Sequence, residues 1–246
     1  METLANGYTL KLPQGVFPLS TDSVLLADFV KLPKNAHVLD LGSGGGTLGL
    51  FLCAKDPACR VTGVELSETA HQAALQNIAD NRLEGRMESI CRDIRDFSQG
   101  QAPGRFDVCL SNPPYFTGGP VSKETPNARR EDTCNIRDLF SAASYALRYG
   151  GDFFLVHKPD RLAELCAYGS KVQLEAKRLR LIRHRIGGEV SLVLLQFRKG
   201  GKPGLIWEEC CLFDESGAPT AEYRKIYHLQ EAPYGGNALP CPHPDW

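Results

Sequence analysis

The sequence predicts a doubly wound α/β fold with a mostly parallel sheet of seven strands, the last of which runs antiparallel. Short apolar runs alternate along the chain with helical patterns, which is typical of strand–helix–strand units. A glycine-rich loop at residues 42–49 follows the first core run, as in folds that bind ligands at the carboxyl edge of a parallel sheet. Two extended segments separated by Gly187-Gly188 indicate a hairpin at the end of the sheet.

The composition supports this class. The chain has 246 residues, of which 42% are hydrophobic and 23% charged, as expected for one large domain with short extensions. We expect an N-terminal extension over 1–34 (a short β pair plus a helix), a core domain over 35–200 and a C-terminal extension over 201–246. The net charge of -1 excludes a global basic field, so contact with nucleic acid requires a local patch.

The cysteines and the apolar runs indicate the redox state of the protein and its relation to membranes. The nine cysteines are odd in number and lack C-x-x-C spacing, which indicates reduced thiols rather than a disulfide framework or a metal site. The first residues have no signal-like layout, and no apolar run approaches membrane-spanning length. We therefore expect a cytoplasmic protein without metal or membrane contact. The sequence leaves the oligomeric state open and slightly favours a monomer.

The N-terminal elements come first. Residues 7–18 alternate around Pro13-Gln14-Gly15, which predicts a short extended pair. Thr21 or Asp22 is placed to cap a helix that runs to Val30, and each could instead serve the site.

The core elements alternate in the predicted order. Apolar runs predict strands at 37–41, 60–65, 87–91, 106–111 and 153–157. Between them, apolar periodicity and capping residues predict helices from Leu50 to Ala54, from a Ser67 cap to about Asn81, from Asp138 to Tyr149 and from Pro159 to Tyr168.

The C-terminal third contains more strands. Residues 177–185 and 190–197 form the predicted hairpin, followed by a strand-like piece at 205–213 and a short helix at 222–227. The first hairpin strand is basic, which fits either an RNA-backbone patch or an edge strand with a solvated face. Its basic residues are Lys177, Arg178, Arg180, Arg183 and Arg185.

The glycine loop and the strand ends around it indicate a site for a nucleotide-like ligand. Glycines let the backbone approach a ligand closely, and the helix that follows presents free N–H groups. Glu65 ends the next strand, 23 positions after Gly42, where a carboxylate can accept hydrogen bonds from a ribose. The spacing Gly44-x-Gly46-x-x-Gly49 also fits an NAD fingerprint, which alone is weak evidence.

A second motif follows the strand at 106–111. Ser111-Asn112-Pro113-Pro114-Tyr115-Phe116 places an amide, two proline carbonyls and an aromatic ring on a stiff ledge at the carboxyl edge of the sheet. The Asn112 oxygen and the Pro113 carbonyl can accept both hydrogens of a planar –NH2 group, and Tyr115 can stack on its face. The alternative is a rigid turn without a chemical role.

Together, Asp40-x-Gly42-x-Gly44-x-Gly46 and the Asn-Pro-Pro-Tyr ledge resemble the class I S-adenosylmethionine-dependent methyltransferases, which have a Rossmann-like fold. The resemblance disfavours NAD. It implies that Asp40 holds the methionine ammonium directly or through water, that Glu65 binds the ribose, and that Asp93, with Asp96 as a near alternative, faces the adenine amine. The cofactor-binding residues it implies are Thr21, Asp40, Gly42, Ser43, Gly44, Glu65, Leu66, Asp93, Ile94 and Asn112.

Further segments resemble one branch, the bacterial tRNA(Val) adenine(37)-N6-methyltransferases. These segments are Thr21–Leu26, Ala128–Glu131 and Val156–Leu162. The branch implies that tRNA is the partner. The implied catalytic residues are Asn112, Pro113, Pro114 and Tyr115, and the implied substrate contacts are Tyr115, Phe116, Arg129 and Arg130. Ribosomal RNA, DNA adenine or a protein glutamine amide are alternative substrates, and a non-catalytic binding module is a third interpretation that the intact motifs disfavour.

Overall fold

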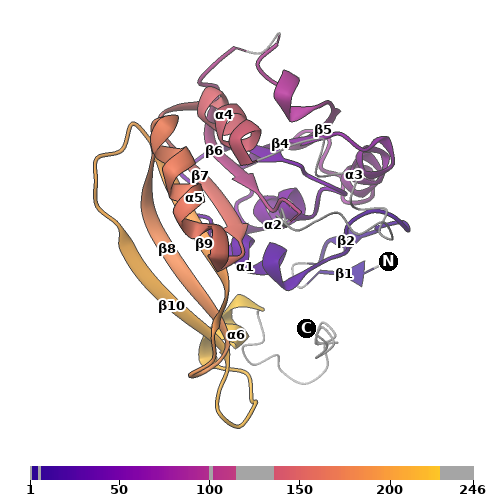
Figure 1. Cartoon of the computed structure of the whole chain (residues 1–246). Helices are drawn as coiled ribbons and strands as arrows, with labels where there is room; N and C mark the ends of the chain where they lie inside the picture. The colour runs from indigo at the N-terminus through magenta and orange to yellow at the C-terminus, as the bar shows by residue number, and fades with distance from the viewer. Residues whose placement is uncertain (1, 5–6, 100–101, 115–135, 228–246) are drawn as a thin grey trace, which may run out of the picture.

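The computed structural model describes residues 2–4, 7–99, 102–114 and 136–227. At its centre lies an eight-stranded sheet in the order β10-β8-β9-β7-β6-β3-β4-β5 (Figure 1). Its strands are β3 (His37–Leu41), β4 (Arg60–Glu65), β5 (Met87–Cys91), β6 (Phe106–Ser111), β7 (Leu147–His157), β8 (Leu174–Arg185), β9 (Val190–Lys199) and β10 (Ile206–Phe213). The helices are α1 (Thr21–Phe29), α2 (Thr47–Lys55), α3 (Glu68–Asp80), α4 (Ile136–Ala146), α5 (Leu162–Lys171) and α6 (Ala221–Ile226), with 3₁₀ turns η1 (Ile94–Asp96) and η3 (Pro159–Arg161).

The predicted fold class is confirmed, and the strand count is corrected from seven to eight. Strand β9 is antiparallel to both neighbours, as expected for the second hairpin strand. It is not the last strand, because β10 adds to the edge of the sheet parallel to β8. Residues 206–213, which the sequence pattern assigns to a C-terminal extension, are therefore part of the main sheet, and the domain division itself stays a prediction.

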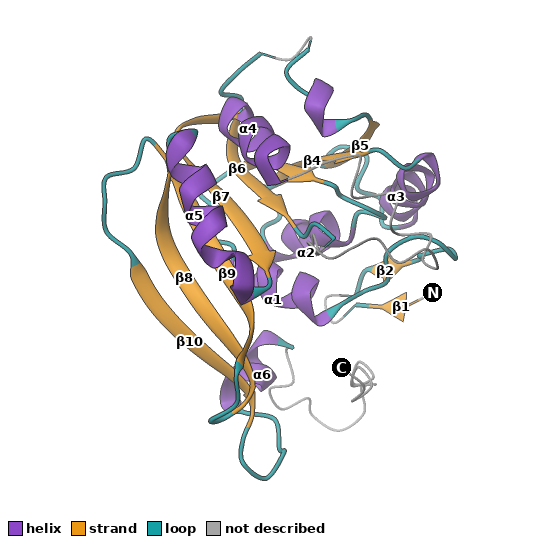
Figure 2. Ribbon diagram, viewed as in Figure 1, coloured by secondary structure: helices purple, strands orange, loops and turns teal. Residues whose placement is uncertain are grey.

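Helices cover both faces of the sheet, and alternate residues of each strand point to opposite sides. On one face Val38, Val108 and Phe154 pack with α1, α2 and α6. On the other face Leu39 and Phe153 pack with α4 and α5, which cross the near side of the sheet in Figure 2. The two apolar layers make the strands hydrophobic on both sides, which is why the sequence shows them as continuous apolar runs.

Two predicted boundaries are wrong for identifiable reasons. Helix α4 ends at Ala146 rather than Tyr149, and Gly150-Gly151 lies inside β7. The pairing of β6 with β7 shifts register here, and Gly150 has a φ of 79°, so the glycines form an irregularity in a strand instead of a helix stop. Helix α1 is capped by Ser20, whose hydroxyl accepts from the Ser23 N–H, rather than by Thr21 or Asp22.

The N-terminal segment packs on α3 instead of forming the expected hairpin. Strand β2 (Thr9–Leu10) pairs with β1 (Glu2–Thr3), not with residues after Gly15. The buried Asn77 side chain accepts from the Lys11 N–H at 2.8 Å and donates to the Lys11 carbonyl and to the Gly45 carbonyl. Asn81 binds both backbone groups of Thr9 in the same way. Segment 9–18 is thereby fixed beside the glycine loop.

The strand order places the site. The chain runs outward through β3, β4 and β5, then returns to place β6 on the other side of β3. Because β3 is parallel to both β4 and β6, their carboxyl ends meet at one edge where the order reverses. A ligand site is expected at this switch point.

Candidate active site

A cavity of about 430 Å³ opens at this edge. The loops after β3, β4, β5 and β6 form its floor and sides, and the N-terminal segment and the start of α1 add a further wall. Its lining residues are Val16, Phe17, Pro18, Ser23, Leu41, Gly42, Ser43, Gly44, Gly45, Thr47, Leu48, Glu65, Leu66, Ser67, Ala70, Asp93, Ile94, Ser111, Asn112, Pro113, Pro114 and Leu139. Most of the predicted cofactor residues and the described part of the ledge therefore share one cavity.

The glycine loop presents bare backbone to the cavity. Gly42, Gly44 and Gly46 have positive φ angles of 74°, 55° and 85°, which other L-residues rarely adopt. A Cβ on Gly42 or Gly44 would meet no atom within 4 Å, so these two cavity positions require glycine for backbone conformation rather than for lack of space. At Gly46, the N-cap residue of α2, a Cβ would also lie 2.7 Å from Met87 Cε.

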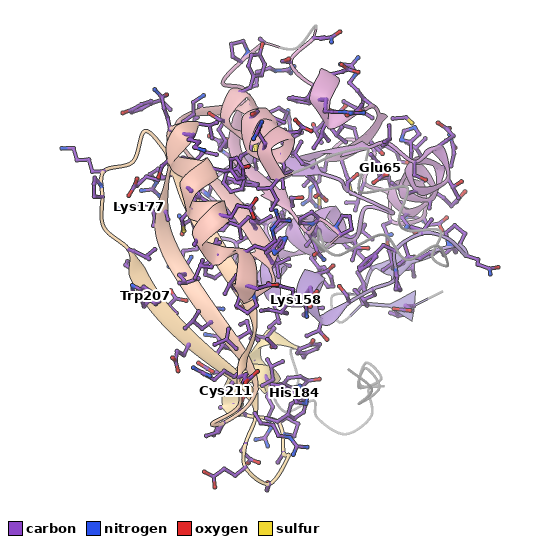
Figure 3. The ribbon with its side chains drawn as sticks, viewed as in Figure 1. Glu65, Lys158, Lys177, His184, Trp207 and Cys211 are labelled. Carbon is purple, nitrogen blue, oxygen red and sulfur yellow. The ribbon has the colours of Figure 1, made fainter. Side chains whose placement is uncertain are left out.

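Glu65 ends β4 and joins two turns at the cavity. One carboxylate oxygen accepts from the Gly44 N–H at 2.8 Å, and the other accepts from the Ser67 N–H at 2.7 Å. These bonds fix the carboxylate against the glycine loop. Each oxygen keeps a further lone pair, so the group can still accept hydroxyl hydrogens from a ligand (Glu65 is labelled in Figure 3).

Asp40 lies in β3 on the sheet face of Val38 and is 1% exposed. Neither of its carboxylate oxygens has a hydrogen-bond partner among the described residues, and the same holds for the buried hydroxyl of Ser43. Burial, and secondarily the charge of Glu65, raises the pKa of Asp40 to about 8. Asp40 itself does not line the cavity, whereas Leu41, Gly42 and Ser43 do.

Asp93 follows β5 as the N-cap residue of η1 and lines the cavity together with Ile94. Its carboxylate accepts from the Arg95 backbone N–H at 2.8 Å and pairs with the Arg95 guanidinium at 2.5 Å. The hydrogen bonds from the Arg95 side chain lower the pKa of Asp93. Asp96, the near alternative, is exposed, accepts from Gln99 and does not line the cavity.

The ledge follows β6 directly. Asn112 is half-buried, Pro113 is buried and Pro114 is exposed, and all three line the cavity. The Asn112 Nδ2 group donates to Ser23 Oγ at 3.1 Å. Ser111 donates to the Leu41 carbonyl at 2.7 Å, which ties the ledge to the end of β3.

Other predicted residues have different placements. Thr21 is the first residue of α1, half-buried, and does not line the cavity, whereas Leu66 lines it and is 48% exposed. The predicted substrate contacts, which are Tyr115, Phe116, Arg129 and Arg130, lie outside the described residues.

Sequence reasoning missed the wall formed by Val16, Phe17 and Pro18 and the contact of Ser23 with Asn112. Ser23 lies in the Thr21–Leu26 segment, where the sequence pattern indicates only a place in a helix. Its burial at 5% exposure is the signal that separates it from a solvent-facing serine, and burial appears only in the folded chain. Val16 of this wall packs against Ala70 and Ala73 of α3, and the Lys11 N–H just before the wall bonds Asn77 across 66 positions of sequence, which local patterns do not show.

The cavity residues fit a methionine-bearing nucleoside. The unpartnered hydroxyl of Ser43 lines the cavity and can bind a polar group of the ligand, and the buried, unpartnered Asp40 carboxyl lies in β3 just before the glycine loop. Glu65 can accept further hydrogen bonds, and Gly42 and Gly44, which have no side chains, let a ligand approach the backbone. In the part of the chain that the structure describes, no group of three or more His, Cys, Asp or Glu side chains could hold a metal ion. Nor does any helix there combine the length and apolarity needed to cross a bilayer.

Comparison with known proteins gives consistent matches. The model of the methyltransferase small domain family matches residues 8–165. A tRNA1(Val) (adenine(37)-N6)-methyltransferase of Porphyromonas gingivalis is 31% identical over 190 residues, which cover 73% of this chain and 74% of the relative. A protein of the same name from Bacteroides fragilis is 30% identical over 182 residues, covering 73% and 76%.

Solved structures share the fold. The structure of a predicted O-methyltransferase from Agrobacterium tumefaciens superposes with a TM-score of 0.70 at 22% identity, covering 85% of this chain and 96% of that one. A geranyl diphosphate C-methyltransferase from Streptomyces coelicolor, in complex with S-adenosyl-L-homocysteine, has a TM-score of 0.55 at 13% identity and covers 72% and 76%.

Proposed function

The chain belongs to the methyltransferase small domain family, and we propose that it methylates N6 of an adenine in tRNA, namely adenine 37 of tRNA(Val), as its relatives are named for doing. S-adenosylmethionine is the methyl donor. The site of action is the cytoplasm, where tRNA is used. The relatives at about 30% identity cover most of both chains, and this supports the substrate class.

The observation that carries the proposal is the shared cavity of the glycine loop and the Asn112-Pro113-Pro114 ledge. A cofactor held on the loop and an amine held on the ledge would meet inside one space of about 430 Å³. This arrangement suits transfer between two bound molecules, where most of the acceleration comes from positioning.

The ledge would prepare the amine as follows. The exocyclic nitrogen of adenine is a weak nucleophile because its lone pair is delocalised into the ring. Asn112 Oδ1 and the Pro113 carbonyl would accept its two hydrogens, which favours a pyramidal nitrogen and directs the lone pair into the cavity. The same two acceptors would stabilise the positive charge that develops on nitrogen. Tyr115 would stack on the base flipped from the anticodon loop.

The cofactor residues would act by binding and orientation. When bound, S-adenosylmethionine would supply an electrophilic methyl group. Transfer would break the sulfur–methyl bond, form the nitrogen–methyl bond and leave a neutral thioether, and the cationic nitrogen would then lose one proton to water, so the protein needs little acid–base catalysis. Glu65 would accept the ribose hydroxyls, and Ser43 would offer its unpartnered hydroxyl. Because Asp40 does not line the cavity, we propose that it reaches the ammonium group through water. Asp93 would share its carboxylate between Arg95 and the adenine amine.

The test is methyl transfer from radiolabelled S-adenosylmethionine to tRNA from a strain that lacks the enzyme, followed by nucleoside analysis. We expect labelled N6-methyladenosine in tRNA(Val), and no label in tRNA that is already modified. Ribosomal RNA, DNA and a glutamine-containing release factor serve as parallel substrates. Label in one of these and none in tRNA would refute the proposed substrate while keeping the methyltransferase class.

A further inference from the structure

We propose that Ser23 is a positioning residue for methyl transfer, which holds the Asn112 amide with its oxygen toward the substrate. This inference rests on the proposed function of the Asn112 ledge. It adds a residue from outside the predicted core domain to the reaction, because Ser23 lies in α1, 89 positions before Asn112.

The contact itself is specific in direction. Asn112 Nδ2 donates to Ser23 Oγ at 3.1 Å, and Asn112 Oδ1 has no hydrogen-bond partner among the described residues. Both side chains line the cavity, and Ser23 is only 5% exposed. The amide is therefore anchored through its nitrogen, and no described residue occupies its oxygen.

The orientation of the amide determines whether the site can work. An asparagine amide carries two donors on one side and an acceptor on the other. The adenine amine offers hydrogens, so it requires the oxygen. An amide turned by half a rotation would present N–H donors to a donor and repel it. A contact that selects one of the two orientations thus selects the active form of the ledge.

The surroundings of Ser23 suit the role of acceptor. The hydroxyls of Ser20 and Ser23 lie 3.3 Å apart, and Ser20 Oγ already accepts from the Ser23 N–H as the helix cap. Ser23 can give its own hydrogen to Ser20 Oγ, which leaves a lone pair for Asn112. In this arrangement Asn112 donates to Ser23, and Ser23 donates to Ser20 at the helix cap.

Helix α1 is held rigidly enough to transmit this position. At its carboxyl end, Lys55 Nζ donates to the carbonyls of Ala27, Asp28 and Val30 at 2.7–3.0 Å. Arg180 pairs with the Asp28 carboxylate at 2.9 Å, which ties the helix to β8. A hydroxyl near the other end of such a helix has a defined place relative to the ledge, as a positioning group requires.

The experiment compares Ser23→Ala and Ser23→Thr with Ser144→Ala as a matched control. Ser144→Ala also removes one short hydrogen bond, from the Ser144 hydroxyl to the Val172 carbonyl, but Ser144 does not line the cavity. We expect Ser23→Ala to lower kcat for tRNA methylation about 10- to 100-fold with an unchanged Kd for S-adenosylmethionine. Ser23→Thr keeps the hydroxyl and should recover most of the rate, and Ser144→Ala should match the wild type.

A second measurement is independent of the substrate. The side-chain amide resonances of Asn112, assigned by their loss in Asn112→Ala, should shift in Ser23→Ala and stay in place in Ser144→Ala. Unshifted resonances, or an unchanged kcat in Ser23→Ala, would overturn the inference. A wild-type protein that does not methylate tRNA would refute the proposed function instead, and the resonances would still decide whether Ser23 anchors the amide.

Discussion

Polar side chains of the candidate site differ in how far the fold satisfies them. Glu65 and Asp93 have backbone or guanidinium partners within the fold itself. The carboxylate of Asp40 and the hydroxyl of Ser43 are buried and have none among the described residues. A buried acceptor without a partner costs free energy, and a ligand donor removes that cost. The unsatisfied groups therefore mark where the fold can receive a ligand, and the satisfied ones mark where it is already arranged.

The first prediction concerns Asn112. Asn112→Ala removes the acceptor for the amine but touches none of the glycine loop. We expect methyl transfer to be abolished while calorimetry shows a Kd for S-adenosylmethionine close to that of the wild type. Asn112→Gln keeps the amide but moves it by one methylene, and a displacement of about 1 Å can cost about 100-fold in rate. Retained turnover in Asn112→Ala would remove Asn112 from the mechanism.

The second prediction follows from the burial of Asp40. Its pKa of about 8 in the folded chain is higher than the usual value of 3.8, so the folded state keeps a proton that the unfolded state has lost. The free energy of unfolding should therefore fall as pH rises from about 4 to about 8, by at most about 1.4 kcal/mol per pH unit from this group. Above pH 8 both states are ionised, and this contribution becomes constant.

Asp40→Asn isolates the effect, because its amide does not titrate. Both proteins are unfolded in urea without cofactor between pH 5 and pH 9. The free energy of unfolding of the variant, relative to that of the wild type, should rise with pH up to about pH 8. A difference that does not change with pH would mean that Asp40 is ionised in the folded chain throughout this range.

Elements at the carboxyl edge of the sheet were predictable, and the wall above them was not. Strand ends follow from apolar runs, so the sequence alone is enough to place Glu65 and Asn112 at one edge. Residues 9–18 have no such pattern, since their order comes from the side chains of Asn77 and Asn81 far along the chain. At Gly150-Gly151 a local pattern is present but misleading. A glycine pair often ends a helix, whereas here it lies in an irregular part of a strand.

The third prediction tests this wall. Asn77→Ala removes three hydrogen bonds, two to the backbone of Lys11 and one to the buried Gly45 carbonyl, and leaves these groups without that partner. We expect a loss of about 1–3 kcal/mol in the free energy of unfolding and a weaker Kd for S-adenosylmethionine, because the glycine loop loses its support. Gln72→Ala on the exposed side of α3, whose side chain donates to Glu68 of the same helix, is the control and should change neither quantity. Equal cofactor affinity in Asn77→Ala would show that the segment does not shape the site.

For the molecule as a whole, the structure separates the basic strand from the site. Strand β8 is separated from β4 by β9, β7, β6 and β3, and Lys177 and Trp207 lie across the molecule from Glu65 in Figure 3. Arg178 is buried, pairs with Glu208 at 2.9 Å and lies over the Phe29 ring at 4.2 Å. Arg180 pairs with Glu208 and Asp28. From the sequence, the basic residues of this strand could have formed an RNA-binding patch. In the structure, Arg178 and Arg180 instead belong to an ion-pair network that joins α1, β8 and β10.

The fourth prediction distinguishes the two interpretations through Glu208. Glu208→Gln leaves the Arg178 guanidinium buried without a charged partner, so we expect the free energy of unfolding to fall, on the order of 3 kcal/mol. Glu209→Gln on the opposite face of β10 is the control. The Glu209 side chain is 62% exposed and lies 3.8 Å from Arg183, a long and weak ion pair, so the free energy of unfolding should change by no more than about 0.5 kcal/mol. Filter binding of tRNA at low temperature, where both variants are folded, supplies the second readout. If Arg178 and Arg180 bound the RNA backbone, removal of the neighbouring carboxylate would strengthen tRNA binding and steepen its salt dependence. Because both arginines are engaged inside the fold, we expect the tRNA Kd of Glu208→Gln to equal that of the wild type, so that stability changes and recognition does not.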